Sequence, residues 1–260
     1  MDTKSGSGEE GAGGDGAAIV ILPGLLCDSR MFAGQVAALD AKVIDGFYGA
    51  AESIGAMAAY ALERMPARSA LVGHSMGARV ALEIWRRAPE RIARLALADT
   101  GVHLPREGEA AGRWRLRDLG RDHGDATLVD AWLPPMLGRR AAGDEALFSR
   151  LRAMAIDAGT ATFERQATAL LARPDVTALL PTIDCPTAVI VGDEDRWSPV
   201  EQHRAIAAAI PSARLRILPG AGHMAPAEDA AGFNAILRNW LDWSAARHTQ
   251  NAMTNGRTNG

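Results

Sequence analysis

The chain has 260 residues, of which 48% are hydrophobic, and a formal net charge of −3. This length suits one large α/β domain or two smaller ones, and the apolar fraction is enough to bury a large core. The small negative charge argues against the basic surface that nucleic-acid binders carry, so we expect no nucleic acid among the partners.

The cysteines and the N-terminal segment predict a cytoplasmic protein. Cys27 and Cys185 are far apart in the sequence and form neither a disulfide framework nor a metal-ligand spacing. The first residues are polar and glycine-rich, without the apolar core of a signal peptide. No apolar stretch is long enough to cross a bilayer, so we expect no membrane partner.

Strand and helix patterns alternate along most of the chain, which predicts a mostly parallel sheet with crossover helices. Both ends, residues 1–17 and 246–260, are polar and rich in glycine or asparagine, and we expect them to be disordered. In chain order the predicted elements are a strand at 17–22, a helix at 30–39, a strand at 42–47, a helix at 54–65, a strand at 69–73, a helix at 76–88, strands at 92–98, 187–191 and 213–218, and a helix at 233–241.

Residues 101–173 break this alternation. They are dense in Arg, Asp and Glu, with apolar residues at helical spacing. We interpret them as several helices inserted between two strands, forming a cap or lid over a core of residues 18–100 and 174–245. Open α/β sheets bind ligands at the carboxyl ends of their strands, where such an insertion would lie.

The strongest chemical signal is GHSMG at 73–77, which lies directly between a predicted strand and a predicted helix. A serine in that sharp turn presents its hydroxyl at a helix N-terminus, and the flanking glycines allow strand and helix to approach closely. The helix dipole there favours developing negative charge. Ser75 is therefore the candidate nucleophile.

A serine hydroxyl needs a base, and His223 follows the last predicted strand, where its loop returns to the same sheet edge. His74 adjoins the serine, and its side chain is expected to point away into packing. For the remaining histidines an ordinary solvated or packed role is the simpler interpretation; they are His103, His123, His203 and His248.

The base in turn needs a carboxylate that orients it, and the turn after the strand at 187–191 carries three acids. Asp195 is the favoured candidate, since it lies three residues beyond Gly192 with room to reach His223. Asp193 and Glu194 are alternatives in the same turn. Asp99, at the end of the strand at 92–98, is a further alternative.

Four segments together resemble the α/β-hydrolase superfamily over roughly residues 18–244. They are LPGLLCD (22–28), GHSMG (73–77), IVGDEDRWSP (190–199) and GAGHM (220–224). The order serine, aspartate, histidine is the one found in these enzymes. The resemblance implies an α/β-hydrolase fold and the catalytic triad Ser75, Asp195 and His223.

The resemblance also implies an oxyanion hole, formed by the backbone N–H groups of Leu25 and Met76, with Gly24 allowing a tight turn. Many relatives have His-Gly where this chain has Pro23-Gly24. Many also have two more strands before this loop, so we expect a sheet shortened at that edge, of about six strands.

Substrate contacts are weakly indicated. Gly24, in the loop after the first predicted strand, is one candidate substrate-binding residue. Candidates in or near the insertion are Trp114, Trp132, Leu133, Met136, Leu137 and Trp197, although ordinary packing explains each of these more simply. Arg113, Arg115 and Arg117 could bind a substrate carboxylate, but neighbouring acids favour a solvated, salt-bridged face. Cys27 could also line the pocket, with a small buried thiol as the simpler interpretation.

These observations predict a serine hydrolase that acts on a small-molecule carboxylic ester or lactone through an acyl-enzyme, without metal or cofactor. The alternatives are a carbon–carbon bond hydrolase or thioesterase of the same fold, or a small-molecule receptor that retains the triad. We expect a monomer or a homodimer.

Overall fold

The computed structural model describes residues 17–243. The predictions of disorder for residues 1–16 and 246–260 therefore lie outside the described residues, as does His248.

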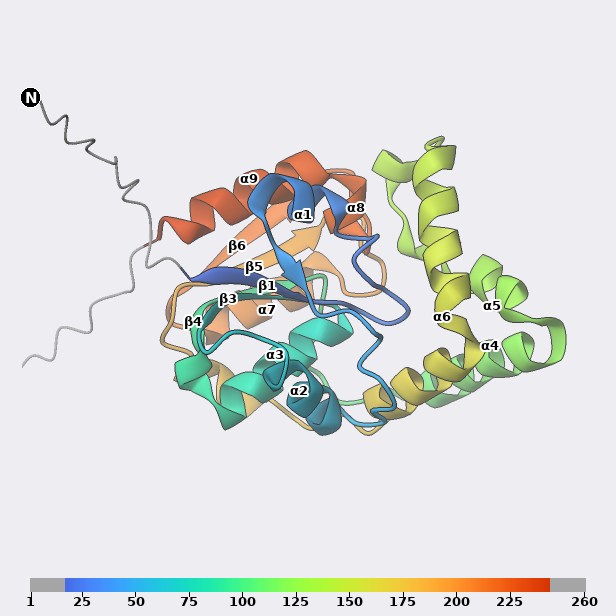
Figure 1. The fold of residues 1–260 in the computed structure, drawn as a ribbon, viewed down its shortest axis with the longest axis horizontal. Coiled ribbons are helices and arrows are strands. Elements are labelled where there is room, and N and C mark those ends of the chain that lie inside the picture. The colour runs from blue at the N-terminus through green and yellow to red at the C-terminus, as the bar shows by residue number, and fades with distance from the viewer. Residues whose placement is uncertain (1–16, 244–260) are drawn as a thin grey trace, which may run out of the picture.

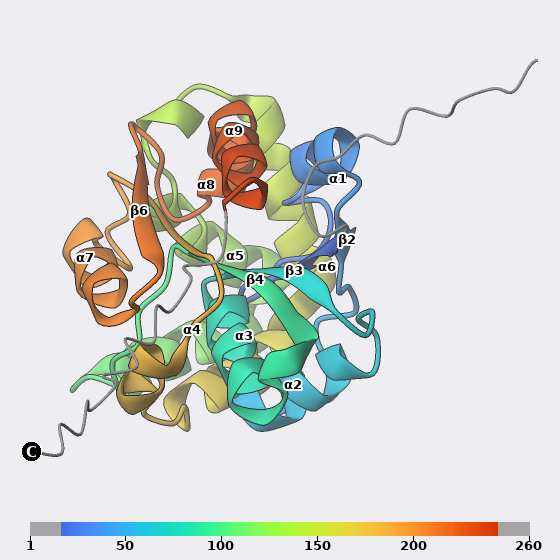
Figure 2. The same ribbon diagram turned by 90° about the vertical axis from the view of Figure 1, so that its left-hand side faces the viewer.

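The described chain contains a sheet of six strands, all of them parallel to their neighbours. The order across the sheet is β2-β1-β3-β4-β5-β6, and Figure 2 shows β6 at one edge and β2 at the other. The strands are β1 (Ala18–Leu22), β2 (Lys42–Val43), β3 (Ser69–His74), β4 (Ile92–Ala98), β5 (Thr187–Gly192) and β6 (Ala213–Leu218). The predicted α/β fold and the shortened sheet are confirmed.

Helices cover both faces of this sheet. Figure 1 shows α1, α8 and α9 on one side and α2 and α3 on the other, with α7 packed against β5 and β6. Their bounds are α1 (Ala33–Leu39), α2 (Ile54–Leu62), α3 (Met76–Arg87), α7 (Val200–Ala209), α8 (Ala225–Glu228) and α9 (Ala230–Leu241). Because both faces are covered, every residue of β3, β4 and β5 is buried, and these strands are continuous apolar runs with little alternation.

Two predicted elements are shorter than expected. The strand predicted at 42–47 ends at Val43, because Gly46, Phe47 and Tyr48 all have positive φ (86°, 51° and 61°), which is incompatible with an extended strand. The helix predicted at 30–39 begins only at Ala33, after two consecutive turns.

The segment between β4 and β5 forms a helical insertion beside the sheet (Figure 1). It contains α4 (Glu109–His123), α5 (Asp125–Trp132) and α6 (Glu145–Leu171). At Gly159, with φ 76° and ψ 166°, α6 is interrupted. The carboxylate of Asp125 accepts a hydrogen bond from the amide of Thr160 at 2.7 Å, which caps the second half of α6. Within residues 17–243, no helix combines the length and apolarity needed to cross a membrane.

The packing of α3 against the sheet requires two residues without side chains. A Cβ atom added at Gly73 would overlap the backbone of Ala78, and one at Gly77 would overlap the carbonyl oxygen of Leu22 in β1. The start of α3 therefore lies against the ends of β1 and β3 at backbone contact distance.

We predict that Gly77→Ala lowers the free energy of unfolding by about 3 kcal/mol, because the new methyl group must displace β1 or α3. Denaturant unfolding monitored by circular dichroism measures this change. Gly112→Ala is the matched control, since Gly112 lies in α4 with open space around its Cβ position. That change should raise stability by about 0.5–1 kcal/mol. Equal stability of Gly77→Ala and the wild type would contradict the close approach.

Candidate active site

Ser75 lies in the turn between β3 and α3 with a strained backbone, at φ 54° and ψ −114°. Such a conformation persists only where surrounding contacts hold it. The Ser75 amide donates to the carbonyl of Ala98 at 2.8 Å, and the Thr100 hydroxyl donates to the Ser75 carbonyl at 2.9 Å. Both contacts come from the end of β4, so the neighbouring strand holds the turn.

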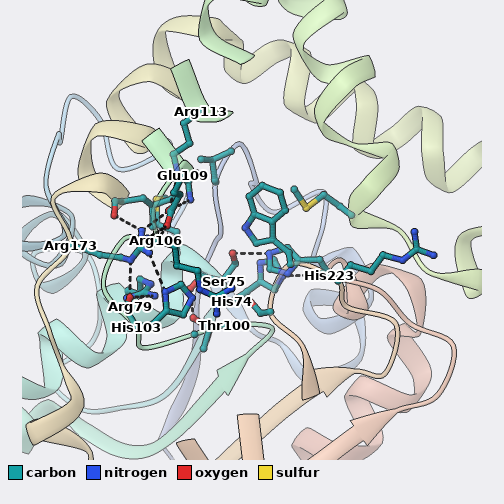
Figure 3. Close-up of a pocket in the computed structure, with 18 of the residues that line it drawn as sticks. His74, Ser75, Arg79, Thr100, His103, Arg106, Glu109, Arg113, Arg173 and His223 are labelled. Carbon is teal, nitrogen blue, oxygen red and sulfur yellow. Dashed lines mark hydrogen bonds and ion pairs between the residues drawn. The ribbon is translucent and has the colours of Figure 1, made fainter. Parts of the chain in front are cut away.

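The structure brings Ser75, His223 and Asp195 into one hydrogen-bonded chain. The Oγ of Ser75 lies 2.8 Å from Nε2 of His223 (Figure 3), and Nδ1 of His223 lies 2.8 Å from Oδ2 of Asp195. A carboxylate can only accept, so Nδ1 carries the proton and Nε2 is free to accept the serine proton. The three residues follow β3, β5 and β6, and they meet at the carboxyl edge of the sheet.

The carboxylate of Asp195 is fixed from its other side. Its Oδ1 accepts hydrogen bonds from the amides of Trp197 and Ser198, both at 2.8 Å. Burial alone would raise the pKa of Asp195, but the charge of a protonated His223 and these hydrogen bonds outweigh burial and lower the pKa. Asp195 is therefore ionised at neutral pH and aimed at the imidazole.

The alternative acids make other contacts. Asp193 accepts from the amide of Gly220 at 2.6 Å, and Glu194 accepts from the amide of Arg139 at 2.7 Å. Asp99 is fully buried, and its Oδ1 accepts from the amide of Gly192 at 3.0 Å. None of them is hydrogen-bonded to the His223 ring.

Two buried groups beside this chain are held neutral. Burial, and then the charge of Asp195, raise the pKa of Asp99 well above its usual value. Burial, and then the charge of His223, lower the pKa of His74 to about 3. The Nε2 of His74 donates to the carbonyl oxygen of His223 at 2.8 Å. His74 thus buttresses the loop of His223 as a neutral imidazole.

The other described histidines lie outside the hydrogen-bonded chain. His203 is buried and accepts from the amide of Thr100 at 2.8 Å, and burial lowers its pKa to about 4. His103 is partly buried on the cavity wall, and His123 is exposed at the end of α4.

The predicted oxyanion donors are the amides of Leu25 and Met76, and both residues line the same cavity as Ser75. Among residues 17–243, neither Leu25 nor Met76 donates its backbone N–H to another protein group, so both remain available as donors. The loop that carries Leu25 is held by Gln166 of α6, whose Oε1 accepts from the amide of Leu26 at 2.8 Å. Leu26 has a positive φ of 58°, a conformation that needs such support.

Glu228, at the end of α8, ties the insertion to the histidine loop. Its carboxylate accepts from the amides of Gly138 at 2.7 Å, Gly222 at 3.0 Å and Met224 at 3.1 Å. Neither Glu228 nor Gln166 was predicted from the sequence. The position of Glu228 five residues after His223 is the one local signal, whereas Gln166 is 140 residues from its partner.

A cavity of about 300 Å³ opens above Ser75 and is bounded by the insertion. Of the candidate pocket residues, Trp132, Met136, Trp197 and Cys27 line it. Trp114 does not: it packs against the core, and the guanidinium of Arg117 lies 4.7 Å from its ring centroid. Leu133 and Leu137 also lie outside the lining, and Gly24 lies behind His74 and Ser75.

A family model described as the alpha/beta hydrolase family matches residues 19–236. The chain belongs to the α/β hydrolase family. It is 31% identical over 194 residues to a Klebsiella pneumoniae protein named "Putative carbamate hydrolase RutD". That alignment covers 67% of this chain and 66% of the relative, slightly under two thirds of its length.

Two solved structures resemble this α/β hydrolase over most of their length. A thermophilic esterase from Thermogutta terrifontis, solved with malate bound, has a TM-score of 0.76 and 27% identity, covering 88% of this chain and 90% of that one. The enol-lactonase from Burkholderia xenovorans LB400 has a TM-score of 0.75 and 26% identity, and the match covers 86% of this chain and 91% of the enol-lactonase.

One wall of this hydrolase's cavity carries arginines. Of the three insertion arginines for which carboxylate binding was the less favoured interpretation, Arg113 lines the cavity, but Arg115 and Arg117 do not. Arg79, Arg106, Arg173 and Arg196 line it as well, and none of these four was predicted from the sequence. The signal for Arg79 was its place in α3, four residues after Ser75. Within residues 17–243 no group of three or more His, Cys, Asp or Glu side chains is arranged to hold a metal ion.

We predict that Asp99→Asn makes the stability of this α/β hydrolase less dependent on pH. The pKa of an unfolded aspartate is about 3.9, and that of folded Asp99 is well above it. Asp99 therefore adds stability below about pH 4, and this stability is lost as the pH rises toward the folded pKa. The variant removes that loss.

Urea unfolding between pH 5 and pH 8 tests this. The wild type should lose more stability across the range than Asp99→Asn, whereas Glu52→Gln, an exposed substitution of the same kind, should follow the wild type. Parallel curves for Asp99→Asn and the wild type would show that Asp99 is ionised in the folded protein.

Proposed function

We propose that this protein is a serine hydrolase of small-molecule carboxylic esters or lactones. The observation that carries this is the hydrogen-bonded chain from Asp195 through His223 to Ser75. Ser75 and His223 line a cavity that is also lined by Leu25 and Met76, whose amides have no protein acceptor. A nucleophile, a base, an orienting acid and oxyanion donors are the parts that acyl transfer needs.

In the first step, Nε2 of His223 takes the proton of Ser75 as Oγ bonds to the substrate carbonyl carbon. The carbonyl oxygen becomes an oxyanion and accepts hydrogen bonds from the amides of Leu25 and Met76. Asp195 stabilises the imidazolium that forms. The bond between the carbonyl carbon and the alkoxy oxygen then breaks. The leaving alkoxy oxygen takes the proton from His223 and departs as the alcohol, and the acyl group remains as an ester of Ser75.

In the second step, water attacks the acyl-enzyme. His223 accepts a proton from the water as its oxygen bonds to the acyl carbon. The second tetrahedral intermediate expels Oγ of Ser75, which recovers a proton from His223, and the carboxylic acid leaves. None of these steps calls on a metal or an organic cofactor.

The related proteins support this class of chemistry. An esterase and an enol-lactonase share the fold at TM-scores of 0.76 and 0.75, and the named carbamate hydrolase shares 31% of aligned residues. A cavity of about 300 Å³ is at the small end for ligand pockets, which suits a small acyl group.

We predict that Ser75→Ala lowers kcat/KM on the best substrate by about 10⁴- to 10⁶-fold, because no other group replaces the nucleophile. A panel of small aryl esters, lactones, acyl thioesters and a carbamate, measured with both proteins, provides the test. A fluorophosphonate probe should label the wild type at residue 75.

Asp195→Asn separates the two buried acids. It should lower kcat by about 10⁴-fold through loss of the correct histidine tautomer, and Asp99→Asn should lower kcat far less.

Full activity of Ser75→Ala would refute the proposal. Tight ligand binding without turnover of any substrate would indicate a receptor, and turnover of thioesters alone would indicate a thioesterase.

We further predict that Gln166→Leu lowers both stability and kcat. The amide of Leu26 would be left buried without an acceptor, which costs about 1–3 kcal/mol. The loop carrying the Leu25 donor would loosen, with a loss in kcat of up to about 10²-fold. Gln166→Glu retains an acceptor and should recover part of kcat. An unchanged kcat in Gln166→Leu would show that the loop does not depend on this contact.

A further inference from the structure

Three arginines form one wall of the cavity, and all of them are buried. The exposed fractions are 7% for Arg79, 9% for Arg113 and 4% for Arg173. The carboxylate of Glu109 is hydrogen-bonded to two of them. It accepts from Arg113 at 3.0 and 3.1 Å and from Arg173 at 2.6 and 2.7 Å. Arg106, Arg196 and Glu107 line the cavity as well, so its lining carries five arginines and two glutamates.

Of the three buried arginines, Arg79 is the one that Glu109 does not bind. Its Nη2 donates a hydrogen bond to the carbonyl oxygen of His103 at 3.1 Å. In the described part of the chain no carboxylate lies within 4.0 Å of its guanidinium. A guanidinium has five N–H donors, and Arg79 borders the cavity. Its remaining donors are available to a ligand.

The surroundings of Arg79 favour an incoming anion. Burial, followed by the positive charge of Arg173, lowers the pKa of Arg79 to about 9, so the side chain is still protonated at neutral pH. The negative charge of Glu109 raises this pKa, but by less than burial lowers it. A buried charge that is only partly compensated is unfavourable, and a bound anion would supply further counter-charge. The planar fork of a guanidinium matches a carboxylate with two parallel hydrogen bonds.

The position of Arg79 also defines which part of a substrate it would meet. It lies in the first turn of α3, four residues after Ser75, and both residues line the same cavity. Figure 3 shows Arg79, Glu109, Arg113 and Arg173 on one side of Ser75 and His223 on the other. Because His223 gives its proton to the departing alcohol, the alcohol lies on the His223 side. The arginine wall faces the acyl side.

We infer that Arg79 binds a carboxylate on the acyl portion of the substrate, so that the preferred substrates are half-esters of small dicarboxylic acids or carboxylate-bearing lactones. This inference rests on the proposed function, because it uses the acyl-transfer geometry around Ser75. Arg113 and Arg173 have a different role: through Glu109 they join α4 to the end of α6 and hold the wall in place.

The test compares substrates that differ in charge at one end. Monoethyl glutarate carries an acyl-side carboxylate, ethyl pentanoate is its neutral counterpart, and O-acetylglycolate carries the carboxylate on the alcohol side. Proton release in a pH-stat measures each rate. The wild type should prefer monoethyl glutarate to ethyl pentanoate by about 10- to 100-fold in kcat/KM, the range for hydrogen bonds to a charged group. It should show no such preference for O-acetylglycolate over ethyl acetate.

Variants of Arg79 test whether this side chain causes the preference for monoethyl glutarate. In Arg79→Gln the ratio of kcat/KM for monoethyl glutarate over ethyl pentanoate should fall close to one, and Arg79→Lys should retain part of it. Arg86→Gln is the matched control: it removes an exposed arginine from the same helix and should leave the ratio unchanged. If Arg79→Gln does not fold, inhibition of the wild type by charged and neutral analogues tests the carboxylate site instead. Glutarate should compete with ethyl pentanoate, and the neutral glutaramide should not.

The outcomes separate this inference from the proposed function. Equal rates on monoethyl glutarate and ethyl pentanoate, or a ratio unchanged in Arg79→Gln, would overturn the carboxylate site while leaving a serine hydrolase. A preference for O-acetylglycolate would overturn its placement on the acyl side. No Ser75-dependent hydrolysis of any ester would refute the proposed function itself.

Discussion

The close approach of α3 to β1 and β3 is the constraint on which the site depends. Ser75 has a positive φ, which a serine does not adopt without support. The backbone contacts at Gly73 and Gly77 and the hydrogen bonds from the end of β4 hold it there. This turn places the hydroxyl and the free amide of Met76 together. The same helix, one turn later, places Arg79 on the cavity wall.

The helical insertion does more than cover the cavity. Its residues contact the loops on both sides of Ser75: Gln166 binds the loop of Leu25, and the carbonyl of Met136 accepts from the amide of His223 at 2.7 Å. Glu228 adds a bridge between Gly138 and the histidine loop. The insertion therefore helps to position both the proposed oxyanion donor and the proposed base.

Electrostatics divide the site into two regions. Near the hydrogen-bonded chain, burial holds His74, His203 and Asp99 neutral, so that Asp195 is the carboxylate that acts on His223. Across the cavity, the arginine wall retains an excess of positive charge. A low-dielectric site with one ionised acid on one side and cations on the other can orient a substrate with an asymmetric charge.

The amino-acid sequence by itself determined the alternation of strands and helices, the six-stranded sheet and the turn at Ser75. These follow from local patterns, namely apolar periodicity and glycines that flank a serine. Only the tertiary structure decided which acid reaches His223, since Asp195 and Asp99 both follow strands and differ in where their side chains point. It also revealed Arg79, Gln166 and Glu228 as parts of the site and removed Trp114 from the cavity. Such contacts depend on how the insertion packs on the sheet, and that packing joins residues up to 140 positions apart, beyond the range of any local pattern.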